Sequence, residues 1–489
     1  MSSTRPVMRR VLCVYPRNTT VYPNFTYAFR FFPKTRALMP PQGLLILAAY
    51  LPKRWEVRFV DEAVRPADDE DYRWADVVMT SGTHSQRHLL DAIAERAHRF
   101  GKLAVIGGPA ASACPEHYPS FDMVHVGELG DATDALVAAI EESAARPPEQ
   151  RVFTTVNRLP LENFPLPAYH LIRAANYLLL NTQWSSGCPF TCEFCDIPEL
   201  YGRNPRFKSP ERLLRELDAI LAQKPLGAVF FVDDNLIGNK KAFKQLLPHL
   251  IAWQERTGRK LRFIGECTLN LGHDEETLGM MREAGFIELF IGVESAEVEA
   301  LVAMGKKQNV RIPMIEAIRK INNYGISVTA GLILGLDTDT DQTVENVVAF
   351  VEETKVPMAI INTLYAPPKT PLWRRLEAEG RLIPQEEVVV SNIAFKEGAA
   401  VVEERFREAV DRCFEPSAVF ARFAYQAEHT HTRRVKASMP PLSADTLVSF
   451  VYALGAMVYH VGVKASYRRE FWGLASQLLP RGQIDSLVN

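Results

Sequence analysis

Three cysteines within eight residues carry the most evident chemistry of this sequence. Cys188, Cys192 and Cys195 lie in the segment G-C-P-F-T-C-E-F-C-D and have the spacing Cys-x3-Cys-x2-Cys. Three thiolates this close together can hold three irons of a cubane iron-sulfur cluster, and the next cysteine, Cys267, lies far downstream. The fourth iron would then lack a protein ligand. We therefore expect a 4Fe-4S cluster with one iron open to a small molecule.

A zinc site or a ferredoxin segment fits the triplet less well. A structural zinc site normally has four protein ligands, often as paired Cys-x2-Cys units. A two-cluster ferredoxin segment would carry a fourth cysteine followed by proline. Three unrelated core cysteines are conceivable, but three of the seven cysteines fall in one loop-like segment that contains Gly187 and Pro189. The cluster interpretation is favoured.

The whole chain limits the class of protein. Its 489 residues suffice for about three domains. Lys plus Arg total 56 and Asp plus Glu 58, so we expect no nucleic-acid partner and no polybasic membrane patch. The N-terminus has only a short apolar run, at residues 11–15, in place of a signal-peptide core. We expect a cytoplasmic protein, in keeping with reduced thiols.

One apolar segment bears on whether the protein contacts a membrane. Residues 447–463 are uncharged over about 17 positions, the lower limit for spanning a bilayer. Ser449, His460 and the tyrosines favour a buried or membrane-surface helix over a span. The run Y-R-R-E-F-W at 467–472 suits a lipid interface and a half-buried helix equally well. Peripheral contact with the inner face of a membrane is therefore an expectation to test.

The first third of the chain alternates short strands with helices. Apolar runs at 11–15, 57–61, 76–81, 103–108 and 123–128 predict strands, and residues 43–51, 89–100 and those following 131 predict helices. This alternation indicates a parallel sheet, which binds ligands at the carboxyl ends of its strands. Small residues there let the backbone approach a large ligand, although turn glycines alone would explain any one of them. The strand-end residues are Thr80, Ser81, Gly82, Gly107, Gly108, Pro109, Gly127 and Glu128.

A second α/β unit follows a proline-bearing stretch. Residues 146–167 are polar and contain five prolines, which predicts a linker. Further strands are expected at 177–180, 228–235, 261–266, 287–295, 328–336 and 358–364. Six such strands predict a partial (βα)6 barrel whose active site lies at the C-terminal strand ends. From about residue 384 the chain is helix-rich and aromatic, and we expect it to cover a substrate.

The cysteine segment resembles the cluster motif of the radical S-adenosylmethionine enzymes. In that family the amino and carboxylate groups of S-adenosylmethionine chelate the open iron, and its cleavage yields a 5'-deoxyadenosyl radical. The domain before it resembles the cobalamin-binding domain of the class B radical methylases, through G-G-P at 107, V-G-E at 126 and Leu129-Gly130-Asp131. M-P-P-Q-G-L-L-I-L-A-A-Y-L-P from 39 and W-E-V-R-F-V-D-E from 55 are similar to the hopanoid C-2 methylases and their cobalamin-dependent relatives.

This resemblance implies an α/β fold in four parts. They are an N-terminal Rossmann-like cobalamin-binding domain (1–145), a linker (146–175), a partial (βα)6 TIM-like radical barrel (176–384) and a helical C-terminal region (385–489). The resemblance also implies a methyltransferase that acts on an unactivated carbon of an apolar substrate, C-2 of a hopanoid. Its cofactors would be a 4Fe-4S cluster, S-adenosyl-L-methionine and cobalamin. A reductant such as flavodoxin or ferredoxin and a lipid-like or polycyclic substrate would be its partners.

The resemblance also assigns residues to the two organic cofactors. Asp233-Asp234-Asn235 stands where the family binds the methionine ammonium, although the common Gly-Gly-Glu form is absent. Glu294 and Ser295 match the ribose-binding strand end, and Phe194 the aromatic whose backbone meets adenine. Glu266 is a weaker candidate for the methionine part or the substrate. The strand-end residues from Thr80 to Glu128 given above would bind cobalamin.

Several alternatives stay open on the sequence. Each strand-end acid could instead cap a helix or form a salt bridge within the barrel. The Asp-x-His-x-x-Gly motif that ligates cobalt from below is missing, since residues 16–42 contain neither His nor Asp. His84 could reach a ligand face, but an exposed loop histidine is the simpler interpretation. A methylase or oxidative cyclase of a tetrapyrrole or other natural product, and a non-catalytic cobalamin- or redox-sensing protein, are the rival functions.

Overall fold

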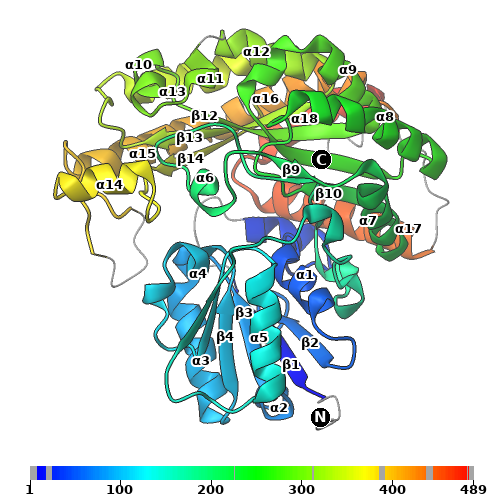
Figure 1. Cartoon of the computed structure of the whole chain (residues 1–489). Helices are drawn as coiled ribbons and strands as arrows, with labels where there is room; N and C mark the ends of the chain where they lie inside the picture. The colour runs from blue at the N-terminus through cyan, green and yellow to red at the C-terminus, as the bar shows by residue number, and fades with distance from the viewer. Residues whose placement is uncertain are drawn as a thin grey trace.

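The computed structural model describes residues 8–17, 25–224, 226–310, 313–384, 391–436, 444–481 and 483. Two six-stranded parallel sheets dominate these residues, one in each half of the molecule (Figure 1). The predicted α/β class, with a Rossmann-like domain, a partial barrel and a helical C-terminal region, is confirmed. The predicted start of the last region, 385, falls in residues 385–390, outside the described ranges.

The first sheet has the strand order β2-β1-β3-β4-β5-β6, and every pairing is parallel. Its central strands are buried on both faces, because helices cover both sides, and this explains their unbroken β-branched runs. The strands are β1 (Arg10–Tyr15), β2 (Glu56–Asp61), β3 (Val77–Ser81), β4 (Leu103–Gly107), β5 (Met123–Val126) and β6 (Arg151–Thr154). The helices are α1 (Gln42–Tyr50), α2 (Asp69–Trp74), α3 (Arg87–Arg99), α4 (Pro109–Ala113) and α5 (Asp131–Glu142).

The predicted linker at 146–175 is wrong for four of its residues. Residues 151–154 form β6, which pairs with β5 and completes the first sheet. An edge strand has only one neighbour, so three of its four residues are exposed and the run R-V-F-T lacks the apolar signal of a central strand. Pairing across the sheet, which no local pattern encodes, decides its structure.

The second sheet has the order β14-β13-β12-β11-β10-β7, so its strands lie side by side in chain order. This is the partial barrel, and its first strand begins at Leu180, three residues after the predicted start. Its strands are β7 (Leu180–Thr182), β10 (Gly227–Phe231), β11 (Leu261–Cys267), β12 (Phe286–Glu294), β13 (Ser327–Leu334) and β14 (Met358–Thr363). A separate antiparallel pair joins β8 (Ser185–Ser186) to β9 (Arg206–Phe207).

Helices cover the outer face of the barrel and continue into the C-terminal region (Figure 1). Those of the barrel are α6 (Ile197–Leu200), α7 (Pro210–Gln223), α8 (Lys240–Thr257), α9 (Glu275–Ala284), α10 (Val298–Ala303), α11 (Lys307–Val310), α12 (Met314–Asn323) and α13 (Thr343–Thr354). The later ones are α14 (Pro371–Ala378), α15 (Ala399–Cys413), α16 (Pro416–His429), α17 (Ala444–Met457) and α18 (Arg468–Leu478). The main apolar core lies between the barrel strands and these helices.

The apolar segment at 447–463 is helical throughout its length. It comprises most of α17 and the π-helix η9 (Val458–Lys464). Residues 447–464 form the one helix, within the described ranges, that is long and apolar enough to cross a membrane, and only 17% of that window is buried. Burial inside the protein therefore does not explain its composition.

Candidate active site between the two sheets

The cysteine loop is closed at its base by the β8–β9 pair, which joins residues 185–186 to 206–207. Gly187, the first residue of the loop, has φ +97°, and a Cβ there would lie 2.8 Å from the carbonyl oxygen of Gly202. Only glycine fits this position without displacing the backbone. The amide of Cys188 donates to that same carbonyl at 3.2 Å, and the amide of Cys195 donates to the carbonyl of Cys192. The chain thus folds the triplet into a compact turn.

The surroundings of the three thiols fit an iron-sulfur cluster. Burial raises the pKa of Cys195 to about 12 and also raises that of Cys188, so both thiols would stay protonated without a cation. Bound iron would supply the positive charge that stabilises the thiolates. Amide groups lie nearby: Nδ2 of Asn235 is 3.9 Å from Sγ of Cys188, and Nε2 of Gln308 is 3.5 Å from Sγ of Cys192. Hydrogen bonds to cluster sulfurs of this kind tune a reduction potential.

The spacing of the thiols disfavours a single metal ion. Across the described residues, one group of three ligating side chains has all its ligand atoms within 4.8 Å of one another, and it is Cys114, Glu116 and His117. The cysteine triplet is more widely spaced than that, as expected when each thiolate binds a different iron.

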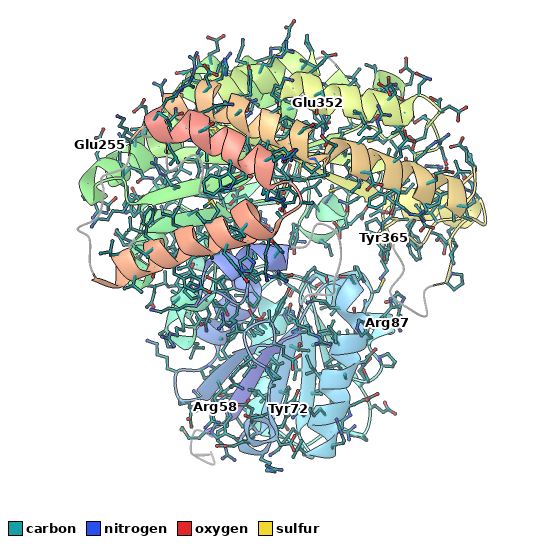
Figure 2. The ribbon with its side chains drawn as sticks, turned by 180° about the vertical axis from the view of Figure 1, so that it is seen from behind. Arg58, Tyr72, Arg87, Glu255, Glu352 and Tyr365 are labelled. Carbon is teal, nitrogen blue, oxygen red and sulfur yellow. The ribbon has the colours of Figure 1, made fainter. Side chains whose placement is uncertain are left out.

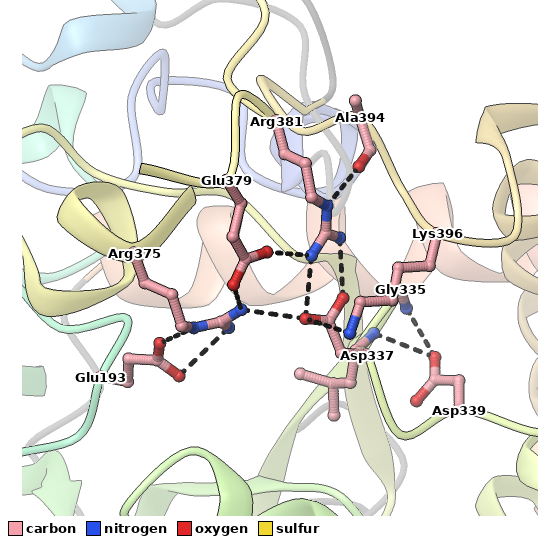
Figure 3. A network of polar contacts seen from close by, with 10 residues as sticks. Glu193, Gly335, Asp337, Asp339, Arg375, Glu379, Arg381, Ala394 and Lys396 are labelled. Carbon is pink, nitrogen blue, oxygen red and sulfur yellow. Dashed lines mark hydrogen bonds and ion pairs between the residues drawn. The ribbon is translucent and has the colours of Figure 1, made fainter. Parts of the chain in front are cut away.

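Ion pairs hold the cysteine loop to the strand ends (Figure 3). Glu193, between the second and third cysteines, accepts a hydrogen bond from Nε of Arg375 at 2.5 Å. Arg375 also donates to Asp337 at 3.0 Å, and Asp337 accepts from Arg381 at 2.7 Å. These guanidinium groups hold the pKa of Asp337 far below its usual range. The network connects the loop to the chain after β13 and to α14, so the cluster position is fixed from outside the loop.

Asp233, which is predicted to bind the methionine ammonium, instead accepts hydrogen bonds from within the protein. Its carboxylate accepts hydrogen bonds from the amide of Trp184 at 3.0 Å and from the amide and hydroxyl of Ser185. It is fully buried, and burial raises its pKa to about 6. Both oxygens thus hold the chain that leads into the cysteine loop, and the prediction for this residue is not supported. The partner residues lie 48 and 49 positions earlier, which no local motif could indicate.

Asp234 and Glu266 are better placed for a cationic ligand. Burial and neighbouring carboxylates raise the pKa of both side chains to about 7. Asp234 accepts one hydrogen bond, from the amide of Gly187 at 2.6 Å, and it lies on the wall of the main cavity. Buried acids that repel one another are stabilised by a cation. S-adenosylmethionine carries an ammonium and a sulfonium, so the barrel mouth fits its charge.

Glu294 ends β12 and Ser295 follows it directly, but Glu294 has a partner that the sequence did not reveal. Nζ of Lys306 lies 2.5 Å from its carboxylate, and both side chains are buried. The same ammonium lies 5.8 Å from the ring centroid of Phe194. Glu294 also has φ +68°, a strained conformation for a residue with a Cβ, of the kind that clusters at functional sites. Lys306 follows a glycine in an ordinary polar turn, so only the fold identifies it.

Phe194 lies between the cysteine loop and the last two barrel strands. It lines a second cavity, of about 310 Å³, with Met304, Leu336, Leu364 and Leu372. The chain after β13 and β14 supplies the last three of these residues. Asn235, also predicted to contact S-adenosylmethionine, is buried and instead lies against Cys188, as described above.

The main cavity, of about 520 Å³, lies between the two sheets. Residues from the carboxyl ends of β1, β2, β3 and β4 line one side. Residues that lie in or just after β7 and β10 line the other, namely Asn181, Gln183, Val232 and Asp234. The barrel opening and the edge of the first sheet therefore share one space. Its wall includes all of Thr80, Ser81, Gly82, Gly107, Gly108, Pro109, Gly127 and Glu128.

Unpartnered polar groups in the cavity wall fit a large ligand with amide side chains. Oγ1 of Thr80, both polar atoms of Gln42 and Oδ1 of Asn181 are buried with no hydrogen-bond partner among the described residues. Such groups destabilise a protein unless a ligand or water satisfies them. Corrin amides are suitable partners. Gln42 and Asn181 were missed, because a lone amide in a sequence carries no signal of a ligand site.

Gly108 and Glu128 are constrained by the protein itself. Gly108 has φ +87°, and a Cβ there would lie 2.1 Å from Oγ of Ser81. Glu128 accepts a hydrogen bond from Arg206 at 2.6 Å and lies 3.1 Å from Arg158, so its carboxylate ties the first sheet to the cysteine loop. His84 is half-buried, against the expectation of an exposed loop histidine, and burial lowers its pKa to about 4.

A cysteine loop at the mouth of a partial (βα)6 barrel, facing the strand ends of a Rossmann-like domain, defines a class of protein: the radical S-adenosylmethionine enzymes that carry a second cofactor domain. Comparison with known families agrees. Residues 182–351 match the radical SAM superfamily, and residues 370–488 match a family described as a domain of unknown function, DUF4070.

Relatives identify the group more closely. The chain is 46% identical to the hopanoid C-2 methylase of Rhodopseudomonas palustris (strain TIE-1) over 98% of its own length and 91% of that protein. It is 32% identical to an uncharacterized methyltransferase of Synechocystis sp., over 95% and 87% of the two chains. The protein belongs to the cobalamin-dependent (class B) radical S-adenosylmethionine methyltransferase family, and it is an enzyme. The cofactors of this family are a 4Fe-4S cluster, S-adenosylmethionine and cobalamin.

Solved structures share the fold at low sequence identity. The cobalamin-dependent radical enzyme OxsB, with aqua-cobalamin and S-adenosylmethionine bound, matches with a TM-score of 0.63 at 16% identity, over 97% of this chain and 75% of that one. The radical methyltransferase TsrM from Kitasatospora setae, with cobalamin and a 4Fe-4S cluster bound, matches with a TM-score of 0.59 at 17% identity, over 78% and 80% of the chains.

Proposed function

We propose that this radical methyltransferase uses cobalamin to add a methyl group to an unactivated carbon of an apolar substrate, C-2 of a hopanoid. The observation that carries the proposal is the 46% identity to a hopanoid C-2 methylase over nearly the whole chain. When bound, the cluster and S-adenosylmethionine supply a 5'-deoxyadenosyl radical, and cobalamin supplies the methyl group. The chain's own residues bind and orient these groups and keep water from them.

In this proposal the barrel mouth holds the cluster and S-adenosylmethionine. Cys188, Cys192 and Cys195 ligate three irons. Asp234 and Glu266 face the cationic part of S-adenosylmethionine, because both are buried and poorly compensated. Glu294, positioned by Lys306, and Ser295 meet the ribose, and Phe194 lies beside the adenine.

The main cavity takes cobalamin in this proposal. The glycines and small residues at the ends of β3, β4 and β5 leave room for a flat ring, and the unpartnered groups of Gln42, Thr80 and Asn181 meet its amides. The cavity is continuous with Asp234 of the barrel mouth, so the two cofactors would face one another across the substrate. A flavodoxin or ferredoxin would reduce the cluster, in the cytoplasm.

Expression in a hopanoid-producing host that lacks a C-2 methylase tests the substrate. We expect a hopanoid heavier by one methylene unit, with the new methyl group at C-2 in the fragmentation spectrum. The variant in which all three cluster cysteines are alanine serves as the control and should leave the lipids unchanged. Unmodified hopanoids with the parent chain, despite 5'-deoxyadenosine formation by the purified protein, would reject the hopanoid and favour another substrate such as a tetrapyrrole.

A further inference from the structure

The exposed face of α17 and η9 has a composition that water does not favour. Between residues 447 and 463 no side chain is charged, yet most of this segment faces outward. Val448 is 67% exposed, Val451 59% and Val463 57%. Apolar groups continue around them at helical spacing, and we call this group the C-terminal apolar surface. It consists of Leu447, Val448, Phe450, Val451, Tyr452, Tyr459 and Val463.

Cations and amphipathic aromatics surround the C-terminal apolar surface. Residues 447–481 contain four cations, Lys464, Arg468, Arg469 and Arg481, and one acid, Glu470. Nζ of Lys464 lies 4.7 Å from the ring centroid of Tyr459. Tyr27 and Trp472 are exposed at the edge, and Arg30 lies over the ring of Tyr27. Apolar residues bordered by tyrosine, tryptophan and cations are typical of a protein surface at a negatively charged lipid interface.

The chain after the helix excludes a membrane span. Immediately after η9 it folds back into α18, whose Phe471, Leu474 and Leu478 are buried. Nε1 of Trp472 donates to the carbonyl of Gly462 at 2.8 Å, which fixes α18 against η9. On the opposite face of α17, Ala453 and Met457 are buried against the protein. From Ala453 onward the helix therefore lies against the body of the enzyme, whereas residues 447–452 are exposed all around the helix.

The C-terminal apolar surface is connected to the main cavity through the N-terminal segment of the chain. Helix α17 packs against the short helix η1 (Phe25–Phe31), and the rings of Phe31 and His460 are 6.2 Å apart. Both views place α17 next to the junction of the two halves, and in Figure 2, seen from behind, it lies on the near side of the molecule. Only a few residues separate η1 from the segment 37–43, which lines the main cavity. One short stretch of chain thus links the surface to the site.

We propose that the C-terminal apolar surface docks the enzyme on an anionic phospholipid bilayer, with α17 and η9 in the plane of the interface, and that the substrate enters from this bilayer. The valines and tyrosines enter the acyl boundary, while Lys464, Arg468 and Arg469 meet lipid phosphates. A bilayer as the source of the substrate presupposes the proposed function, whereas docking itself does not.

Vesicle flotation of the full cofactor-loaded enzyme tests the docking. We expect the parent to float with vesicles of equimolar phosphatidylglycerol and phosphatidylcholine, and less with phosphatidylcholine alone or at high salt. The double variant V448E/V451E should bind the vesicles at least about tenfold more weakly than the parent. Replacing Lys464, Arg468 and Arg469 by glutamine should remove only the preference for phosphatidylglycerol. The matched control is V152E/V156E, since these valines are 51% and 80% exposed on the first domain.

Two results would overturn the docking proposal. One is flotation that does not depend on the surface as proposed, with either a parent enzyme that stays in the soluble fraction or a V448E/V451E variant that floats as well as the parent. The other is a dimer in light scattering that V448E/V451E dissociates, with no vesicle binding, because a second copy would then cover the surface. Unchanged 5'-deoxyadenosine formation establishes that the variant is folded.

Activity separates this proposal from the proposed function. With an apolar substrate embedded in vesicles, V448E/V451E should transfer methyl groups about tenfold more slowly than the parent, and with the substrate in detergent the two should be equal. Flotation without methyl transfer in either presentation would refute the proposed function and leave docking intact. Equal rates from vesicles would refute entry from the bilayer.

Discussion

The barrel mouth and the main cavity are both incomplete without a ligand, but in different ways. At the barrel mouth, Asp234, which also borders the main cavity, and Glu266 are buried acids whose pKa values are raised to about 7. In the cavity, the groups without partners are the neutral amides and hydroxyl of Gln42, Asn181 and Thr80. The first kind of instability depends on pH and is relieved by a cation, and the second depends on hydrogen bonds alone. The difference indicates which ligand each site selects: charge at the mouth, and shape with amides in the cavity.

Removing all three cluster cysteines should have the largest effect and tests whether the two sites are separate. The variant in which Cys188, Cys192 and Cys195 are alanine should lose the brown iron-sulfur absorbance and all 5'-deoxyadenosine formation. Because none of these residues lines the main cavity, cobalamin binding measured by its visible spectrum should persist. Loss of cobalamin binding in a folded variant would contradict the separation of the two sites.

Replacing Glu266 by glutamine should uncouple stability from activity. The pKa of this carboxyl is about 7 in the fold, against 4.5 without the fold, so the folded protein holds the extra proton between these values. Stability therefore falls as pH rises through that window, and above pH 7 the cost is complete. At pH 8, urea unfolding of the variant without S-adenosylmethionine should need roughly 1 to 3 kcal/mol more than the parent.

The same variant should produce 5'-deoxyadenosine at least about tenfold more slowly, since a charged interaction of roughly 1.5 kcal/mol or more is lost. At pH 4.5 the stability difference should vanish, which serves as the internal control. A variant less stable than the parent at pH 8 would mean that Glu266 is compensated in the empty enzyme.

Replacing Gly108 by alanine should affect the cavity and spare the cluster. The new Cβ would lie 2.1 Å from Oγ of Ser81 in a backbone with φ +87° and ψ −169°, a conformation that costs about 1 to 3 kcal/mol for a residue with a Cβ. We expect weaker cobalamin binding and unchanged iron content. The matched control is Gly473→Ala in α18, where a Cβ meets no atom within 4 Å. Equal cobalamin affinity in both variants would show that Gly108 is not part of the cobalamin site.

Replacing Thr80 by valine should have the smallest effect. It should stabilise the cobalamin-free enzyme, although it weakens cobalamin binding. The buried hydroxyl has no partner, so a methyl group in its place should stabilise the cobalamin-free enzyme by about 1 kcal/mol at every pH. Cobalamin affinity should fall several-fold. Urea unfolding at pH 6 and pH 8 checks that the gain does not depend on pH, in contrast to Glu266→Gln. A destabilised variant would show that the hydroxyl is satisfied.

The sequence predicts those parts of the site that a single segment encodes. The cysteine spacing, the glycines at strand ends and the order of the barrel strands are local patterns, and the fold they predicted is confirmed. The position of Asp233 in the motif predicts a ligand contact, whereas its hydrogen bonds to Trp184 and Ser185 depend on packing across the sheet. Lys306, and β6 at the edge of the first sheet, were missed for the same reason. Long-range pairing decides what one segment cannot encode.

Glu128 has a consequence for how such an enzyme can evolve. Its carboxylate comes from the domain of the first sheet, and the two guanidinium groups that hold it, from Arg158 and Arg206, lie in the connecting segment and at the base of the cysteine loop. Because the bond spans the boundary, exchanging either half for a module that lacks its side of the ion pair would leave the other side without a partner. The two cofactor domains must therefore vary together, and a chimera would need Glu128 and both arginines from the same parent.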